Sequence, residues 1–134
     1  MRIFRSKPTG LSPSAPDVKR LLFVQTRAPY GSLAGQEGLD ALLMGSAFTP
    51  CTLLFLGDAV FQLTRDQQPG AIGRKAFTKG FGALAEYGVE RICASAADLE
   101  ARALDGSQLG IEVKPLDDAA VRDLFASADC VLSF

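Results

Sequence analysis

The sequence predicts a single α/β domain in which a mainly parallel sheet is covered by helices on both faces. Short apolar runs of four to six residues alternate with longer segments whose apolar residues recur at helical spacing. Only a few turn residues separate the two kinds of segment, which is typical of parallel strands joined by helical crossovers. The length of 134 residues suits one domain with one hydrophobic core.

Five short segments are predicted to be strands, at residues 21–24, 51–56, 91–94, 111–114 and 130–134. Helical spacing or helix-end signals predict helices over residues 39–48, 70–87, 96–104 and 117–127. Gly88 is placed to end the second helix, and Ser95 and Asp117 are placed to cap the third and fourth. Five strands with this alternation fit a flavodoxin-like three-layer domain.

Residues 1–19 differ in composition from the rest of the chain. They are rich in Ser and Pro, show no periodicity, and carry four basic residues and one acidic residue. We therefore predict a flexible N-terminal extension over residues 1–19 and the α/β domain over residues 20–134.

The charge and hydropathy of the chain exclude several classes of protein. Residues 20–134 carry ten basic and fourteen acidic residues, which is a poor basis for tight nucleic-acid binding. Apolar runs stay shorter than the roughly 18 residues of a membrane span, and the basic N-terminus is not followed by the apolar region of a secretory signal. We therefore expect a cytoplasmic protein without a membrane partner.

The three cysteines, Cys51, Cys93 and Cys130, form no CxxC pair. Their odd number and wide spacing argue against a disulfide framework. The sequence has no histidine, so a zinc site would lack its commonest ligands, and we expect no metal and no cofactor. All three cysteines fall in predicted strands, where a core thiol is the simpler interpretation.

Functional sites of parallel sheets form at the carboxyl ends of the strands, which here lead into loops 26–36, 57–63 and 94–98. Loop 26–36 and the start of the helix after it contain Gly31, Gly35 and Gly38, and Asp58 follows the second strand. One hypothesis is a phosphate cradle with a ribose-binding acid, as in a nucleotide- or flavin-binding protein. The spacing G-x₃-G-x₂-G departs from the dinucleotide fingerprint, so a glycine-rich turn before a helix is the simpler interpretation.

Loop 57–63 is unusually apolar for a strand-to-helix connection. Loops usually lie at the surface, so an apolar loop suggests a lid, a pocket wall or a subunit interface. The alternative is that the loop folds back on its own core.

Loop 94–98 carries Ser95-x-x-Asp98, which is a helix-start pattern. A cysteine at position 95 would have its thiolate stabilised by the helix N-terminus. This chain has a serine there, and no histidine is present to make its hydroxyl a nucleophile. Cys93, two residues earlier, is the nearest thiol, and a packed thiol is favoured for it.

Three stretches make the chain recognisable: APYG (residues 28–31), AGQEGLDALL (residues 34–43) and DAVFQL (residues 58–63). More generic matches are KRLLFV (residues 19–24) and VLSF (residues 131–134). With them, residues 19–134 resemble the TusC/DsrF family of the DsrE/F/H superfamily.

The resemblance implies a heterohexamer with two related sister subunits, one DsrE/TusD-like and one DsrH/TusB-like. Such a complex passes persulfide sulfur from an upstream donor to a small acceptor protein, for 2-thiouridine at the tRNA wobble position or, alternatively, in dissimilatory sulfur oxidation. It also implies that the carrier cysteine belongs to the DsrE/TusD-type subunit, at the position matched here by Ser95. If this chain carried sulfur itself, Cys93 would be the residue, because a serine hydroxyl cannot hold a transferable persulfide. We therefore expect a structural subunit with no direct tRNA contact, and interface or pocket residues Tyr30, Gly31, Gly35, Asp58, Phe61 and Gln62.

The resemblance begins almost at Val18, where family chains tend to start Met-Lys-Arg. A GTG codon can start translation as methionine and is read internally as valine. One hypothesis is therefore that the native chain starts at Val18. The alternative is a genuine basic arm over residues 1–19 that docks on an acidic partner surface.

Overall fold

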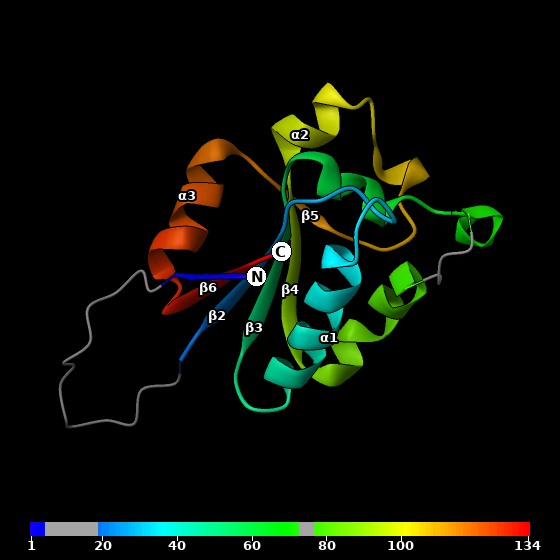
Figure 1. Cartoon of the computed structure of the whole chain (residues 1–134). Coiled ribbons are helices and arrows are strands. Elements are labelled where there is room, and N and C mark those ends of the chain that lie inside the picture. Colours follow the sequence, from blue (N-terminus) through cyan, green and yellow to red (C-terminus); the bar gives the residue numbers. More distant parts are fainter. Residues whose placement is uncertain (5–18, 73–76) are drawn as a thin grey trace, which may run out of the picture.

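The computed structural model describes residues 1–4, 19–72 and 77–134. Its centre is a six-stranded sheet of order β1-β6-β2-β3-β4-β5 (Figure 1). Strands β2 to β6 run parallel, and β1 pairs antiparallel with β6. The strand bounds are Arg2–Phe4 (β1), Leu21–Gln25 (β2), Cys51–Phe55 (β3), Val89–Ser95 (β4), Lys114–Leu116 (β5) and Cys130–Ser133 (β6).

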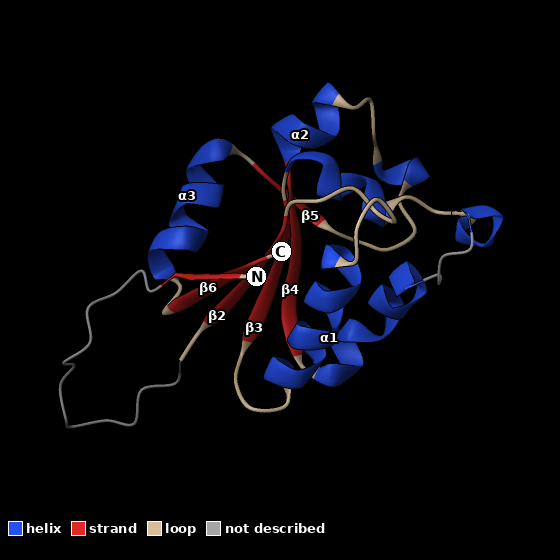
Figure 2. Ribbon diagram, in the orientation of Figure 1, coloured by secondary structure: helices blue, strands red, loops and turns tan. Residues whose placement is uncertain are grey.

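Helices cover both faces of the sheet, which confirms the predicted three-layer α/β class. Figure 2 shows α3 on one side of the sheet, with α1 and the helical segment before β4 on the other. The α-helices are Ala34–Ser46 (α1), Ala96–Ala101 (α2) and Asp118–Ser127 (α3), and the 3₁₀ segments are Gly57–Leu63, Pro69–Ile72, Phe77–Tyr87 and Gly106–Gln108. The helix predicted over residues 70–87 thus corresponds to two 3₁₀ segments, and residues 73–76 lie outside the described residues.

The strand order determines where a site can form. From β2 to β5 each strand pairs with the next, so right-handed crossovers place the connecting helices on one face. The connection through α3 returns across the sheet to β6 and covers the other face. The connections from β2 and into β6 therefore lie on opposite faces, and the loops at the carboxyl ends of these two neighbouring strands diverge. In flavodoxin the corresponding switch point lies one strand further into the sheet.

Burial on both faces explains why the strands read as continuous apolar runs. On the α1 face, Phe23 and Phe55 belong to one buried cluster, in which Phe55 meets Phe81 edge-on at 5.4 Å between ring centroids. On the α3 face, alternate residues such as Val24 and Leu54 pack with Leu124 in a second cluster. The core is therefore two layers separated by the sheet.

The fourth predicted strand is displaced. The sequence predicts a strand over residues 111–114 that stops at Pro115, whereas β5 is Lys114–Leu116 and contains that proline. Proline interrupts strands because it has no backbone N–H to donate. Here β5 lies at the edge of the sheet and pairs on one side only, where proline is tolerated.

The prediction of five strands, with no structure before Arg20, is wrong for the first residues of the chain. Residues 2–4 pair with residues 133–131 as an antiparallel edge strand. Residues 5–18 lie outside the described residues, so the flexible extension predicted there stays a prediction.

Deleting residues 1–18 and supplying a methionine is expected to change the melting temperature by no more than about 3 °C. Met1, Arg2 and Ile3 are exposed, and the strand they belong to is at an edge, so loss of these described residues removes little buried surface. Thermal unfolding followed by circular dichroism measures this. A much larger decrease, or loss of assembly with partners, would establish a structural arm.

Candidate functional site

The carboxyl end of β4 is the position where a sulfur carrier would need its thiol. Here β4 ends at Ser95, and the Ser95 Oγ accepts a hydrogen bond of 3.2 Å from the backbone N–H of Asp98. The predicted N-cap is confirmed, and Asp117 caps α3 in the same way through the N–H of Ala120. The helix N-terminus that could stabilise a thiolate is therefore occupied by a capping hydroxyl.

Cys93 lies in β4, two residues before that cap, and its exposed fraction is 0%. Burial raises the pKa of the Cys93 thiol above its ordinary value, while nearby Arg91 and Lys114 lower it by less. A buried thiol with a raised pKa is protonated near neutral pH and is a poor nucleophile. These observations support the packed-thiol interpretation of Cys93.

The other two cysteines differ from each other. Cys51 is fully buried, and burial together with the charge of Glu90 raises its pKa to about 11. Cys130 is only half-buried in β6, although the sequence predicts a core position for it. Cys130 is the first residue of β6, and the pairing of this strand with β1 begins only at Val131.

The apolar loop after β3 forms the 3₁₀ segment Gly57–Leu63 and packs mainly on its own domain. Ala59, Val60 and Leu63 are buried in the cluster on the α1 face. Phe61 differs because 37% of it is exposed. Most of the apolar surface of this segment is therefore buried inside its own domain, and the ring of Phe61 remains partly exposed.

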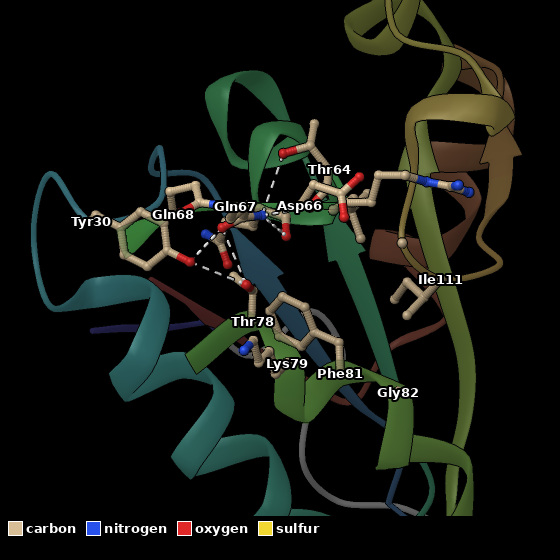
Figure 3. Close-up of a pocket in the computed structure, with 14 residues that line it drawn as sticks. Tyr30, Thr64, Asp66, Gln67, Gln68, Thr78, Lys79, Phe81, Gly82 and Ile111 are labelled. Carbon is tan, nitrogen blue, oxygen red and sulfur yellow. Dashed lines mark hydrogen bonds between the residues drawn. The ribbon is translucent and has the colours of Figure 1, made fainter. Parts of the chain in front are cut away.

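Tyr30, in the loop that follows β2, lies at a hollow of about 420 Å³ (Figure 3). Its hydroxyl is hydrogen-bonded to Gln67 Oε1 and lies 3.2 Å from Thr78 Oγ1. Gln67 in turn donates to the backbone carbonyl of Gln62 at 2.9 Å. Tyr30 has a φ of 67°, a left-handed conformation that is uncommon for a bulky residue, so these bonds fix a strained loop against the 3₁₀ segment.

Two buried glutamines continue this network beneath the loop. Gln25, the last residue of β2, donates to the carbonyl of Gly35 at 3.1 Å. Gln62 donates to the carbonyl of Arg27 at 2.8 Å, and its Oε1 has no hydrogen-bond partner among the described residues. Gln25, Gln67 and Thr78 were not predicted as site residues; the one available signal was the polar Gln25 at the end of an apolar run.

The residues suggested for a phosphate cradle have other roles. Gly35 is buried inside α1, and Glu37 places a negative charge in the first turn of that helix, where it opposes an anion. Asp58 is hydrogen-bonded to Arg102, with Oδ1 2.9 Å from the guanidinium. Gly31 and Asp58 both line an open groove of about 1080 Å³ between β2 and β6, but these contacts do not support a nucleotide site.

The six candidate residues therefore gather at the carboxyl edge of the sheet, though not in one cavity. Tyr30 and Gln62 line one hollow, and Gly31 and Asp58 line the groove beside it. Phe61 belongs to the segment between them, and Gly35 anchors the loop through Gln25. Within the described residues, this arrangement brings no two reactive side chains together.

Among the described residues, the helices are too short or too polar to cross a bilayer. Residues 19–134 match the model of the DsrE/DsrF-like family. The chain is 40% identical over 119 residues to Protein TusC of Escherichia coli O8 (strain IAI1), covering 87% of this chain and 100% of that protein. Protein TusC of Shigella flexneri serotype 5b (strain 8401) matches with the same identity and coverage.

A solved structure gives the same fold. The crystal structure of the ychN protein from E. coli superposes with a TM-score of 0.74 over 87% of this chain and 99% of that one, at 23% identity. The family match extends over the whole α/β domain. The chain belongs to the DsrE/DsrF-like family.

Proposed function

We propose that this chain is a structural subunit of a cytoplasmic sulfur-relay complex, and not the subunit that carries sulfur. Its family membership and its similarity to TusC proteins support a role in sulfur relay for tRNA modification. The specific product we propose is 2-thiouridine at the wobble position. Because the curated relatives carry the TusC name, this route is favoured over dissimilatory sulfur oxidation.

One observation carries the non-carrier assignment. The end of β4, where α2 begins, presents the hydroxyl of Ser95 instead of a thiol. Sulfur relay needs a thiolate that attacks a persulfide and then carries the terminal sulfur itself. The nearest thiol, Cys93, is sealed in the core and cannot reach a donor without local unfolding.

The work of such a subunit is to hold a sister subunit's cysteine where donor and acceptor reach it. We propose that the partners are a DsrE/TusD-like and a DsrH/TusB-like chain, two copies of each subunit forming the complex. The rigid carboxyl edge, held by Gln25, Gln62 and Tyr30, supports the proposed contact surface, and Phe61 is its apolar anchor. Anchors of this type supply much of the free energy of an interface.

Co-expression tests the proposal. The chain expressed alone is expected to self-associate or to be poorly soluble, because Phe61 and the neighbouring edge lack their partner surface. With both sisters, size-exclusion chromatography with light scattering should give one species of about six chains. A stable monomer that elutes apart from its sisters would contradict the proposal.

A further inference from the structure

A further concave surface lies at the β5 edge of the sheet, where residues of α2, of the segment that follows it and of β5 line a hollow. It has a volume of about 530 Å³ and shares no lining residue with the hollow at Tyr30 or with the groove between β2 and β6. Its wall is mainly apolar, and two acidic residues complete it. The apolar lining residues are Ala96, Leu99, Ala103, Leu104, Leu109, Val113 and Pro115.

The chain holds this wall in a definite conformation. α2 ends with the N–H of Leu104 bonded to the carbonyl of Leu99 at 2.9 Å, and Ala103 between them has a φ of 54°. A residue at this place in a helix C-terminus is usually glycine, because a side chain is unfavourable in the left-handed conformation. Alanine here keeps a methyl group in the wall of the hollow.

The rim of the hollow is acidic. Glu100 and Asp105 line it, and Glu100 forms no ion pair with any described residue. Ser107 donates to the Asp105 carboxylate through its N–H and its hydroxyl, and these bonds lower the pKa of Asp105, so the negative charge is fixed in place. Residues 96–118 carry six acidic and two basic residues, whereas the remainder of the chain has three more basic than acidic residues.

The edge strand β5 is poorly suited to pair with a further strand. It is three residues long and contains Lys114 and Pro115, and short length, lysine and proline all disfavour edge-to-edge pairing. A partner is therefore expected to enter with side chains and not by extending the sheet. A large apolar side chain would fit the hollow, and cations on either side of it would face the carboxylates.

We propose that this hollow docks a basic segment of a partner protein, with one large apolar side chain against Leu104 and Val113 and Lys or Arg side chains against Glu100 and Asp105. The hollow provides the apolar contact, and its negative charge favours a positively charged segment over a negatively charged one. The surface is separate from the edge around Phe61, so it is available for recruiting a protein to the assembled complex.

The test uses a fluorescent peptide with leucine at its centre and two arginines on each side, compared with the same peptide with serine at its centre. Each is titrated by anisotropy into the purified chain, together with its sisters where they assemble. The leucine peptide is expected to bind at least about tenfold more tightly than the serine peptide. The charge-reversing pair Glu100→Lys and Asp105→Lys should weaken its binding by about tenfold or more.

The matched control is the pair Asp40→Lys and Asp123→Lys, which makes the same change in net charge on α1 and α3, where both residues are exposed. It should change affinity by less than about threefold, because the reversed charges are remote from the hollow. Circular dichroism checks folding, and light scattering of the same samples reports assembly separately. No binding, equal affinity for both peptides, or an equal loss in both double variants would overturn the docking proposal.

Discussion

Phe61→Asp is expected to abolish assembly with the sister subunits while the chain still folds. Phe61 is 37% exposed, so on the isolated domain an aspartate can turn its charge toward water. At an interface the same carboxylate would be buried without a partner, at a cost of roughly 3–5 kcal/mol, which is about a thousandfold in affinity. Co-purification of tagged sisters, quantified by light scattering, measures the effect.

Phe48→Asp is the matched control for this substitution. Phe48 is 89% exposed and precedes β3, so it lies at the opposite end of the strands from Phe61. The control variant should assemble like the wild type, since its charge remains in water. Normal assembly of the Phe61 variant, or equal defects in the two variants, would show that the segment 57–63 is not the contact surface.

Gly38→Ala is expected to destabilise the domain by roughly 2–3 kcal/mol, although glycine to alanine inside a helix is ordinarily stabilising. A Cβ at position 38 would lie 2.3 Å from Nε2 of Gln25 and 3.0 Å from the ring of Phe134. Gln25 is buried, and moving it would break its hydrogen bond to Gly35. A buried polar group left without a partner adds about 1–3 kcal/mol to the overpacking.

Chemical denaturation compares this variant with Gly82→Ala, where a Cβ meets nothing within 4 Å. The control should be neutral or slightly stabilising. If Gln25 is the obstacle, Gly38→Ala should cost less in a Gln25→Ala background than in the wild type. Equal costs in both backgrounds would show that the contact is not the cause.

Local signals predicted the elements whose cause is local. Ser95 and Asp117 were placed as helix caps because the chemistry of a cap lies within three residues of sequence. The runs at β2 and β3 were predicted because parallel strands buried on both faces are continuously apolar. Pattern alone was sufficient in these places.

The errors occurred where distant residues decide. β1 was missed because its partner, β6, lies at the other end of the chain. Pro115 ended a predicted strand because the sequence does not show that β5 is an edge. Gly38 was interpreted as part of a glycine-rich turn, whereas it is required by the buried Gln25.

The sequence predicted where along the chain the candidate site lies, but not which side chains contact one another there. The stretch 57–63 was correctly singled out as apolar, yet only the structure separates the buried Val60 from the partly exposed Phe61. The bonds from Tyr30 to Gln67 and Thr78 span 37 and 48 residues, and no local pattern specifies them. The fixed position of the loop that carries Tyr30 is therefore a property of the folded chain.

If this chain is a structural subunit that carries no sulfur, the persulfide must form on another subunit of the complex, and its location can be measured. The assembled complex is treated with a persulfidated donor, and peptides are examined by mass spectrometry for the addition of one sulfur, about +32 Da. We expect the added sulfur on a cysteine of the DsrE/TusD-like sister and none on Cys93. Because the Cys93 thiol is buried, the Cys93→Ala variant should transfer sulfur at a rate near that of the wild type. A persulfide on Cys93, together with loss of transfer in Cys93→Ala, would contradict it.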